Sequence, residues 1–426
     1  MIRIYVDQVS ERLLYVLDFV LRDRGIEYAV TNDRLFFLDS QGVRLNYSEY
    51  ELPDVINFKP ASVLFDEDIR KYEIATEDFE GEECLCFDGT DDPLASIFYL
   101  LSRYEEYLIP AVDNHDRFDM TKSLQVRYGW VEKVMCDRWA EAFIRYLSRH
   151  ANDEIAVFKP PLTMVPTFDI DNAYAFQLKE GVRHWGAMAK DYMKRDRIRL
   201  SERRQVMSGA RKDPYDTYEL IESTSDEGFD VKVFWLLGDY RAYDRNISFR
   251  DPRHQRLIRR IAQKAAVGIH PSYRSNTYSS LLSEEKQRLE QILGHTVLHS
   301  RQHFLKLSIP MTYHRLLESG IKHDFTMGMA DRVGFRAGTS RPFKWFDLEK
   351  DCVTELVIHP FAYMDGTLNE YLDFRPEEAM SKISSLYNEV RQFGGEFTFI
   401  WHNETIGDYG KWEGWKKVFE FTLSLK

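Results

Sequence analysis

Two aspartates separated by one residue follow an apolar stretch of the chain. Asp169 and Asp171 come after residues 162–165, a run of apolar and β-branched side chains typical of a buried parallel strand. Because side chains alternate along a strand, we expect both carboxylates on the same side. Two neighbouring carboxylates are comfortably ionised only beside a cation or an arginine. The pair therefore indicates a candidate cation site, and an acidic turn after a strand is the simpler alternative.

Polar residues follow the later apolar runs in the same way. These runs, at 231–237, 267–270, 297–300, 322–326, 356–359 and 397–402, predict six further strands. The polar residues at or just past their ends are His270, Arg301, His303, Asp324, His359 and His402. One histidine after a strand is usually structural, but the carboxyl ends of parallel strands converge on one face. We therefore expect these side chains to share a site.

Helical patterns separate the predicted strands, at about 255–265, 283–293, 313–318 and 376–393. Alternating strands and helices indicate a parallel sheet, and seven strands in about 265 residues favour closure. The predicted fold class is α/β: residues 156–426 form a distorted (β/α) barrel of about seven strands, preceded by a smaller α/β accessory domain, residues 1–155.

The sequence of the accessory domain predicts strands and helices but contains no recognisable catalytic group. Strands are predicted at 3–6, 27–30 and 34–38, and a helix at about 131–148. Asp92 and Pro93 have the residue types of an N-cap and a first helical position, so a helix is predicted from Pro93 onwards. His115 is interpreted as a polar loop residue.

Composition excludes several classes of function. The chain has 426 residues and a net charge of −12, which argues against broad binding to nucleic acid. The chain has no run of about eighteen apolar residues, so no membrane span is predicted. Without a signal-like N-terminal segment, a cytoplasmic location is expected. The four cysteines have neither disulfide-framework nor zinc-ribbon spacing. The sequence gives no indication of oligomeric state.

One basic stretch stands out between residues 190 and 212, where nine lysines and arginines occur. A solvated helical insertion is the favoured interpretation. The alternative is a basic lid over an anionic substrate or a contact to an acidic surface.

The motifs resemble those of the NodB-type polysaccharide deacetylases, in the order found in that family. Residues 167–171 (TFDID) resemble the first motif in the variant form that separates its aspartates by one residue. Residues 268–273 (GIHPSY) resemble the second motif, 300–304 (SRQHF) the third, and 358–360 (IHP) or 400–402 (IWH) the last. Residues 334–340 and 364–368 also resemble a bacterial subgroup with an extra N-terminal domain. The resemblance covers about 161–426.

The resemblance implies a metal-dependent hydrolase, usually with zinc, that removes acetyl groups from N- or O-acetylated sugars. It makes Asp169 the general base, Asp171 and His270 metal ligands, and Arg301 the residue that orients the base. His359 or His402 would be the acid. The chemistry is consistent, because a divalent cation lowers the pKa of water and imidazole protonates a departing amine near neutral pH.

One position departs from the family pattern. Arg274 stands where the second motif carries another histidine, and arginine does not ligate a cation. His303 or His402 would then supply the missing nitrogen, or the site binds metal weakly and Arg274 faces an anionic sugar substituent. Tyr273, Arg336 and Asp324 are further candidate substrate-binding residues.

The leading hypothesis is a hydrolase for an N- or O-acetylated saccharide that depends on a divalent metal, with zinc as the expected ion. An alternative is a catalytically inactive saccharide-binding or scaffold protein on the same fold, suggested by Arg274. A third is a metal-dependent amidohydrolase or phosphodiesterase on an unrelated barrel.

Overall fold

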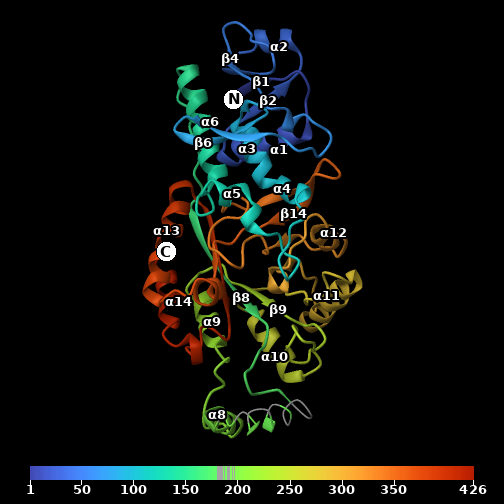
Figure 1. Cartoon of the computed structure of the whole chain (residues 1–426), viewed down its shortest axis with the longest axis vertical. Helices are drawn as coiled ribbons and strands as arrows, with labels where there is room; N and C mark the ends of the chain where they lie inside the picture. The colour runs from blue at the N-terminus through green and yellow to red at the C-terminus, as the bar shows by residue number, and fades with distance from the viewer. Residues whose placement is uncertain (180–185, 187, 190–191, 194, 196) are drawn as a thin grey trace.

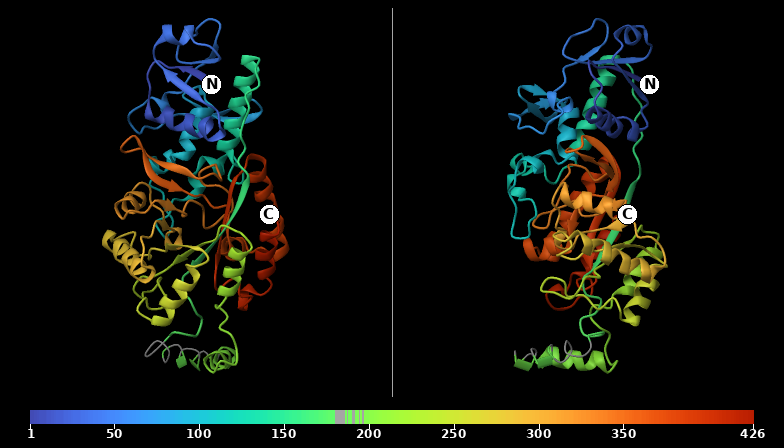
Figure 2. Two further views of the ribbon diagram at one scale, coloured as in Figure 1. Left: turned by 180° about the vertical axis from the view of Figure 1, so that it is seen from behind. Right: turned by 90° about the vertical axis from the view of Figure 1, so that its right-hand side faces the viewer.

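The computed structural model describes residues 1–179, 186, 188–189, 192–193, 195 and 197–426. The molecule is elongated, with the N-terminal region at one end and α8 (Arg197–Met207) at the other (Figures 1 and 2). The largest sheet lies between them. This sheet carries the residues that the sequence marked as chemically interesting.

The N-terminal region contains two small sheets. A parallel sheet of order β2-β1-β3-β4 contains β1 (Ile2–Tyr5), β2 (Tyr28–Thr31), β3 (Val43–Tyr47) and β4 (Ile56–Phe58). An antiparallel sheet contains β5 (Ile74–Phe79), β6 (Glu82–Phe87) and β7 (Thr90–Asp91). The helices are α1 (Glu11–Val20), α2 (Arg34–Asp39), α3 (Pro93–Leu101), α4 (Tyr104–Leu108), α5 (Leu124–Arg127) and α6 (Met135–Ala151).

Local capping explains where two of these helices begin. Asp92 accepts hydrogen bonds from the first backbone N–H groups of α3, and Pro93 occupies its first position, which confirms that prediction. The strand predicted at 34–38 is wrong, because these residues form α2. The Asp33 carboxylate accepts from the Phe36 N–H and starts a helix there.

The large sheet has nine strands in the order β13-β14-β12-β11-β10-β9-β8-β16-β15. Its strands are β8 (Leu162–Ile170), β9 (Lys232–Trp235), β10 (Ala266–Ile269), β11 (His299–Ser300), β12 (His323–Asp324), β13 (Phe343–Asp347), β14 (Cys352–Ile358), β15 (Tyr363–Met364) and β16 (Gly395–His402). All neighbours are parallel except β13 and β14. Each of the seven predicted strands is confirmed, and β13 and β15 are additional.

Helices flank this sheet. They are α9 (Tyr218–Asp226), α10 (Pro252–Ile261), α11 (Ser279–Leu293), α12 (Met311–Glu318), α13 (Pro376–Phe393) and α14 (Lys416–Leu423). In Figure 1, α13 and α14 lie together on one flank, with α10, α11 and α12 along the other. Four of these helices, α10 to α13, confirm the predicted helical segments.

Closure of the sheet distinguishes a barrel from an open sheet. The strand order begins at β13 and ends at β15, and within the described residues no strand pairing joins these two edges. The structure therefore shows a mixed α/β protein with one large sheet and flanking helices. A closed barrel stays a prediction.

The N-terminal region packs tightly against the β13–β14 hairpin. The Arg12 Nε lies 2.6 Å from a carboxylate oxygen of Asp351, and the Tyr15 hydroxyl donates to the Lys344 carbonyl. One cluster of buried apolar side chains extends from β1 through the large sheet to α14. The two regions thus share a core, and the predicted boundary at 155/156 stays a prediction.

The basic stretch at 190–212 lies partly outside the described residues, as with Lys190 and Lys194. Its described part includes α8, in which Arg203 is buried with its guanidinium over the Phe176 ring. In the described part of the chain, no helix combines the length and apolar character needed to span a membrane.

Candidate active site

Asp169 and Asp171 leave the C-terminal end of β8 toward the same site. Asp169 is in register with Phe234 of β9 and His402 of β16, so it has a strand on each side. Its carboxylate is buried and accepts a hydrogen bond of 3.0 Å from Arg301. The fully buried Arg301 also donates to Thr167 and to the Phe325 carbonyl, which fixes the guanidinium in place. This ion pair fixes the orientation of the Asp169 carboxylate.

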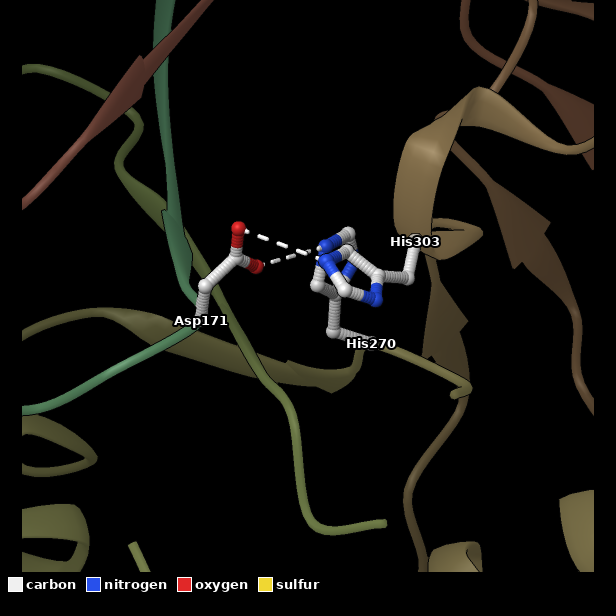
Figure 3. A group of neighbouring side chains, drawn as sticks. All are labelled: Asp171, His270 and His303. Atoms are coloured by element: carbon white, nitrogen blue, oxygen red, sulfur yellow. Dashed lines mark ion pairs between the residues drawn. The ribbon is translucent and has the colours of Figure 1, made fainter. Parts of the chain in front are cut away.

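Asp171 faces two histidines (Figure 3). Its Oδ1 lies 3.2 Å from the His270 Nε2, and its Oδ2 lies 3.4 Å from the His303 Nε2. One ligand atom from each of the three residues lies within 4.8 Å of the other two. Because the three residues follow three different strands, the cluster forms only when β8, β10 and β11 assemble.

The other ring nitrogen of each histidine has a hydrogen-bond acceptor. The His270 Nδ1 lies 2.6 Å from the Arg301 carbonyl, and the His303 Nδ1 lies 3.0 Å from a carboxylate oxygen of Asp244. Since a carbonyl oxygen only accepts, the His270 Nδ1 donates to it, and Nε2 is the ring nitrogen that faces Asp171. Such partners orient imidazoles that bind metal ions.

The close approach of β10 and β11 depends on Gly268. A Cβ at this position would lie 2.8 Å from the His299 carbonyl oxygen and 2.6 Å from the Phe234 ring. Any larger residue would push these strands apart. The glycine in the second motif therefore helps to bring His270 and His303 together.

The charges of the cluster are strongly coupled. Although burial opposes ionisation, the two imidazoles hold the pKa of Asp171 well below its usual range. Burial likewise opposes charge on His303, but Asp171 and Asp244 raise its pKa to about 9. The Asp171 Oδ1 is buried, and the described residues offer it no hydrogen-bond donor. A cation at this point would satisfy that oxygen and replace the proton on His303.

A cavity of about 190 Å³ opens over the cluster. His402 lines it from the end of β16, and its Nδ1 lies 2.9 Å from Asp365. Burial opposes charge on His402, but Asp365, with smaller effects of Asp171 and Asp169, raises the pKa of His402 well above its usual value. His402 is thus a protonated group facing the carboxylates. Arg117, Phe304, Tyr371 and Trp412 also line the cavity.

The remaining predicted residues lie outside this cavity. His359 contacts Glu396 through Nδ1 and His323 through Nε2, each within 3.0 Å. Asp324 is fully buried and accepts from Thr326. Arg336 is buried in a bidentate ion pair with Glu106.

Tyr273 and Arg274 lie beside the site. The Tyr273 hydroxyl contacts His115, and its backbone N–H donates to Asp244. Arg274 lines a neighbouring cavity that Asp244 also borders, and its guanidinium lies over the Tyr278 ring. Arg274 is not among the residues that line the cavity over the cluster.

Sequence reasoning missed three residues of the site. Asp365 lies in a segment that the sequence marked, 364–368, but no role was assigned to it. Asp244 and Arg117 occupy loops that carry no strand-end signal, so their proximity to the site follows only from the tertiary structure.

A second group of possible metal ligands lies elsewhere, at His314, Asp347 and Glu349. Within it, the Lys350 ammonium forms an ion pair with Asp347.

The fold and the site together define an α/β protein with an Asp-His-His cluster at the carboxyl ends of parallel strands. A family of unknown function (DUF7033) matches residues 2–152. No curated protein sequence matches the chain.

Several solved structures are similar to the chain at low identity. A putative polysaccharide deacetylase from Mycobacterium smegmatis is 17% identical, with 63% of this chain and 86% of that chain covered and a TM-score of 0.41. A probable polysaccharide deacetylase from Pseudomonas aeruginosa is 11% identical, with 62% and 84% covered and a TM-score of 0.36. A polysaccharide deacetylase from Bacillus cereus is 10% identical, with 62% and 85% covered and a TM-score of 0.28.

Proposed function

We propose that this protein is a metal-dependent hydrolase that removes acetyl groups from an N- or O-acetylated saccharide. The observation that supports it most directly is the Asp171–His270–His303 cluster, placed between the Asp169–Arg301 pair and His402. The order of the deacetylase-like motifs supports the choice of reaction.

The residues of the cluster fit a divalent cation. One carboxylate oxygen and two imidazole nitrogens are the donors of catalytic zinc sites, which keep a further position open. Asp171, His270 and His303 would hold the ion, so His303 replaces the histidine absent at position 274. When bound, the cation supplies Lewis acidity that lowers the pKa of water and polarises the acetyl carbonyl.

Asp169 is placed to act as the general base. Its Oδ2 lies 3.9 Å from the His270 Nε2, next to the proposed metal position, while Oδ1 is held by Arg301. The guanidinium orients the carboxylate, so Asp169 accepts the proton of the attacking water.

His402 is placed to act as the general acid. It faces the cavity through the edge of the ring opposite Asp365, and Asp365 keeps it protonated. His402 therefore donates a proton to the leaving amine or alkoxide. His359, the other candidate, lies outside the cavity and makes contacts of its own with Glu396 and His323.

Metal analysis combined with acetate release tests this proposal. The purified protein is loaded with zinc, dialysed and assayed on a panel of N- and O-acetylated oligosaccharides. We expect about one ion per chain and release of acetate by the wild type. Asp171→Asn loses the ion, whereas Asp169→Asn retains it and loses a factor of about 10² to 10⁴ in kcat.

Two histidine variants provide the matched control. His402→Gln is expected to lose activity in the same range while it retains the ion, and His359→Gln is expected to retain both. A wild type that binds no divalent ion, or that releases acetate equally well in chelator, contradicts the proposal. Saccharide binding without release of acetate would instead support a non-catalytic binding protein.

A further inference from the structure

The N-terminal region reaches the candidate active site through one short loop. Residues 112–118, here called the 112–118 loop, are closed by a bridge between Val112 and Phe118. Arg117 is the single residue of the first 155, all of which the structure describes, that lines the cavity over the cluster. The loop therefore connects a region without catalytic motifs to the site.

Asp113 organises this loop from within. Its carboxylate accepts from the backbone N–H groups of His115 and Arg117, and it forms an ion pair of 2.6 Å with the Arg117 side chain. The Arg117 side chain is 12% exposed. Its guanidinium is thus held in one orientation before it contacts anything outside the loop.

The loop contacts the segment that follows β11 at three points. Arg117 Nη1 donates to the Phe304 carbonyl at 3.1 Å, Asp116 pairs with Lys306 at 2.8 Å, and the His115 ring packs 5.0 Å from the Phe304 ring. His115 also contacts the Tyr273 hydroxyl at 3.2 Å. The first three contacts hold the residues that directly follow His303.

The segment needs such support because its backbone is in an uncommon conformation. Phe304 and Leu305 have φ angles of 60° and 52°. A residue with a side chain adopts this left-handed region at a cost of about 1 to 2 kcal/mol, so neighbouring contacts must hold it there. The turn directs His303 back toward Asp171, and the His303 N–H bonds the Pro271 carbonyl beside the second motif.

We propose that Arg117 is a positioning residue for the candidate metal centre. By holding the Phe304 carbonyl, it stabilises the left-handed turn that keeps His303 aimed at Asp171, and His303 is the ligand that replaces the histidine absent at Arg274. The N-terminal region thereby completes the metal site. This inference rests on the proposed function, because it assigns His303 as a ligand.

Zinc affinity of the full-length protein tests the inference without an activity assay. The zinc Kd is measured by competition with a chromophoric chelator for the wild type, Arg117→Ala and Arg117→Lys. We expect Arg117→Ala to weaken binding by about 10- to 100-fold, the range for partners that orient a ligand. Arg117→Lys, which keeps one donor for the Phe304 carbonyl, is expected to fall between the two.

Arg138→Ala is the matched control. Arg138 is also a partly buried arginine of the N-terminal region, 20% exposed, and it links that region to Glu389 of α13; neither residue lines the cavity over the cluster. Its loss is expected to lower the thermal unfolding midpoint and to change the zinc Kd by less than twofold. This separates an effect on His303 from a general loosening of the two regions.

The outcomes distinguish the inference from the proposed function. A wild type that binds no zinc overturns both. A wild type that binds zinc, with Arg117→Ala binding as tightly or Arg138→Ala weakening zinc equally, overturns the inference alone. If Arg117→Ala does not fold, the Arg117→Lys and Asp116→Ala variants decide. Unchanged zinc affinity in Arg117→Lys, together with reduced zinc affinity in a folded Asp116→Ala variant, would also overturn the role of Arg117.

Discussion

The two aspartates that end β8 have opposite surroundings, although only Ile170 separates them. Asp169 is paired with an arginine, and Asp171 faces two imidazoles. The arginine holds one oxygen of Asp169 by a hydrogen bond, whereas the imidazole nitrogens that face Asp171 are groups that can bind a cation. The roles proposed for them, base and ligand, therefore differ because their neighbours differ, since the residue type is the same.

The Asp365–His402 pair gives a pH-dependent prediction. Against burial, Asp365 raises the pKa of His402 well above its usual value, so the protonated acid persists to higher pH. Activity that needs this proton is present below the pKa of His402 and is lost above it. Asp365→Asn lowers that pKa, and the alkaline limb of the kcat/KM profile is expected to move to lower pH.

The profile is measured with an acetylated substrate at fixed zinc concentration. Thr422→Val, which removes a buried hydroxyl that contacts Tyr363 and does not line the cavity, is the control and should leave the alkaline limb in place. An Asp365→Asn profile that coincides with the wild type would show that His402 does not supply the proton.

At the scale of single residues, the sequence predicted well which residues meet at the strand ends and poorly which partners the other candidates have. Asp169, Asp171, His270, Arg301, His303 and His402 converge because parallel strands bring their carboxyl ends together. Arg336 follows no strand of the sheet, and it is buried against Glu106, a residue 230 positions away. Pairing over such a distance leaves no local signal.

The turn after β11 gives a prediction at the scale of elements. Phe304 has positive φ, a conformation that glycine adopts without the steric cost of a Cβ. Phe304→Gly and Phe304→Ala both remove the ring and differ only in that Cβ. We expect the glycine variant to be the more stable of the two, by about 1 kcal/mol in the free energy of unfolding.

Urea unfolding of the two variants side by side measures the difference. The same pair of substitutions at Leu316, which is buried in the regular helix α12, is the control, and there alanine should be the more stable residue. An alanine variant at 304 that is as stable as the glycine variant would mean that the turn is not left-handed in solution.

Helix α10 carries a buried histidine with a pH-dependent effect on stability. Burial lowers the pKa of His254 from 6.5 to about 4, and its Nε2 finds no partner among the described residues. The unfolded state therefore binds a proton at a pH where the folded state does not, and stability falls as pH drops below 6.5. Linkage gives a loss of about 2 kcal/mol between pH 7.5 and pH 5.

His254→Gln removes this titration. The decrease in unfolding free energy from pH 7.5 to pH 5, measured in urea, is expected to be about 2 kcal/mol smaller than in the wild type. The same substitution at the exposed His295 should leave the decrease unchanged. Equal decreases in the wild type and in His254→Gln would contradict the prediction.

The sequence predicted long elements better than short ones. Seven of the nine strands of the large sheet and the helices α10 to α13 were predicted, because their apolar runs and helical periods are distinctive, whereas β13 and β15 were missed. Residues 34–38 were misassigned because five residues rich in leucine and phenylalanine fit either period, and the capping carboxylate of Asp33 decided the outcome. Closure of the sheet depends on edge pairing, which residue patterns do not encode.

At the scale of the whole molecule, the N-terminal region and the large sheet are joined by a buried charge. Asp137 of α6 is fully buried between two arginines from different parts of the chain, Arg24 at 2.8 Å and Arg341 at 2.7 Å. It also accepts from the Thr339 hydroxyl. Arg24, Asp137 and Arg341 are more than 100 positions apart in the chain, so no local pattern in the sequence indicates that they meet.

Replacement of Asp137 tests whether the two regions unfold together. Asp137→Ala leaves two buried guanidinium groups without their carboxylate, and loss of one partner from a buried pair costs about 3 to 5 kcal/mol. Because the apolar core is continuous, this loss is expected to lower one common transition, seen alike by far-UV circular dichroism and by tryptophan fluorescence in urea. Lys417→Ala, which removes an exposed ion pair with Glu377, should change stability by less than about 0.5 kcal/mol. Two separate transitions, with only one of them shifted by Asp137→Ala, would instead mean that the N-terminal region folds as an independent domain that the buried charge merely docks.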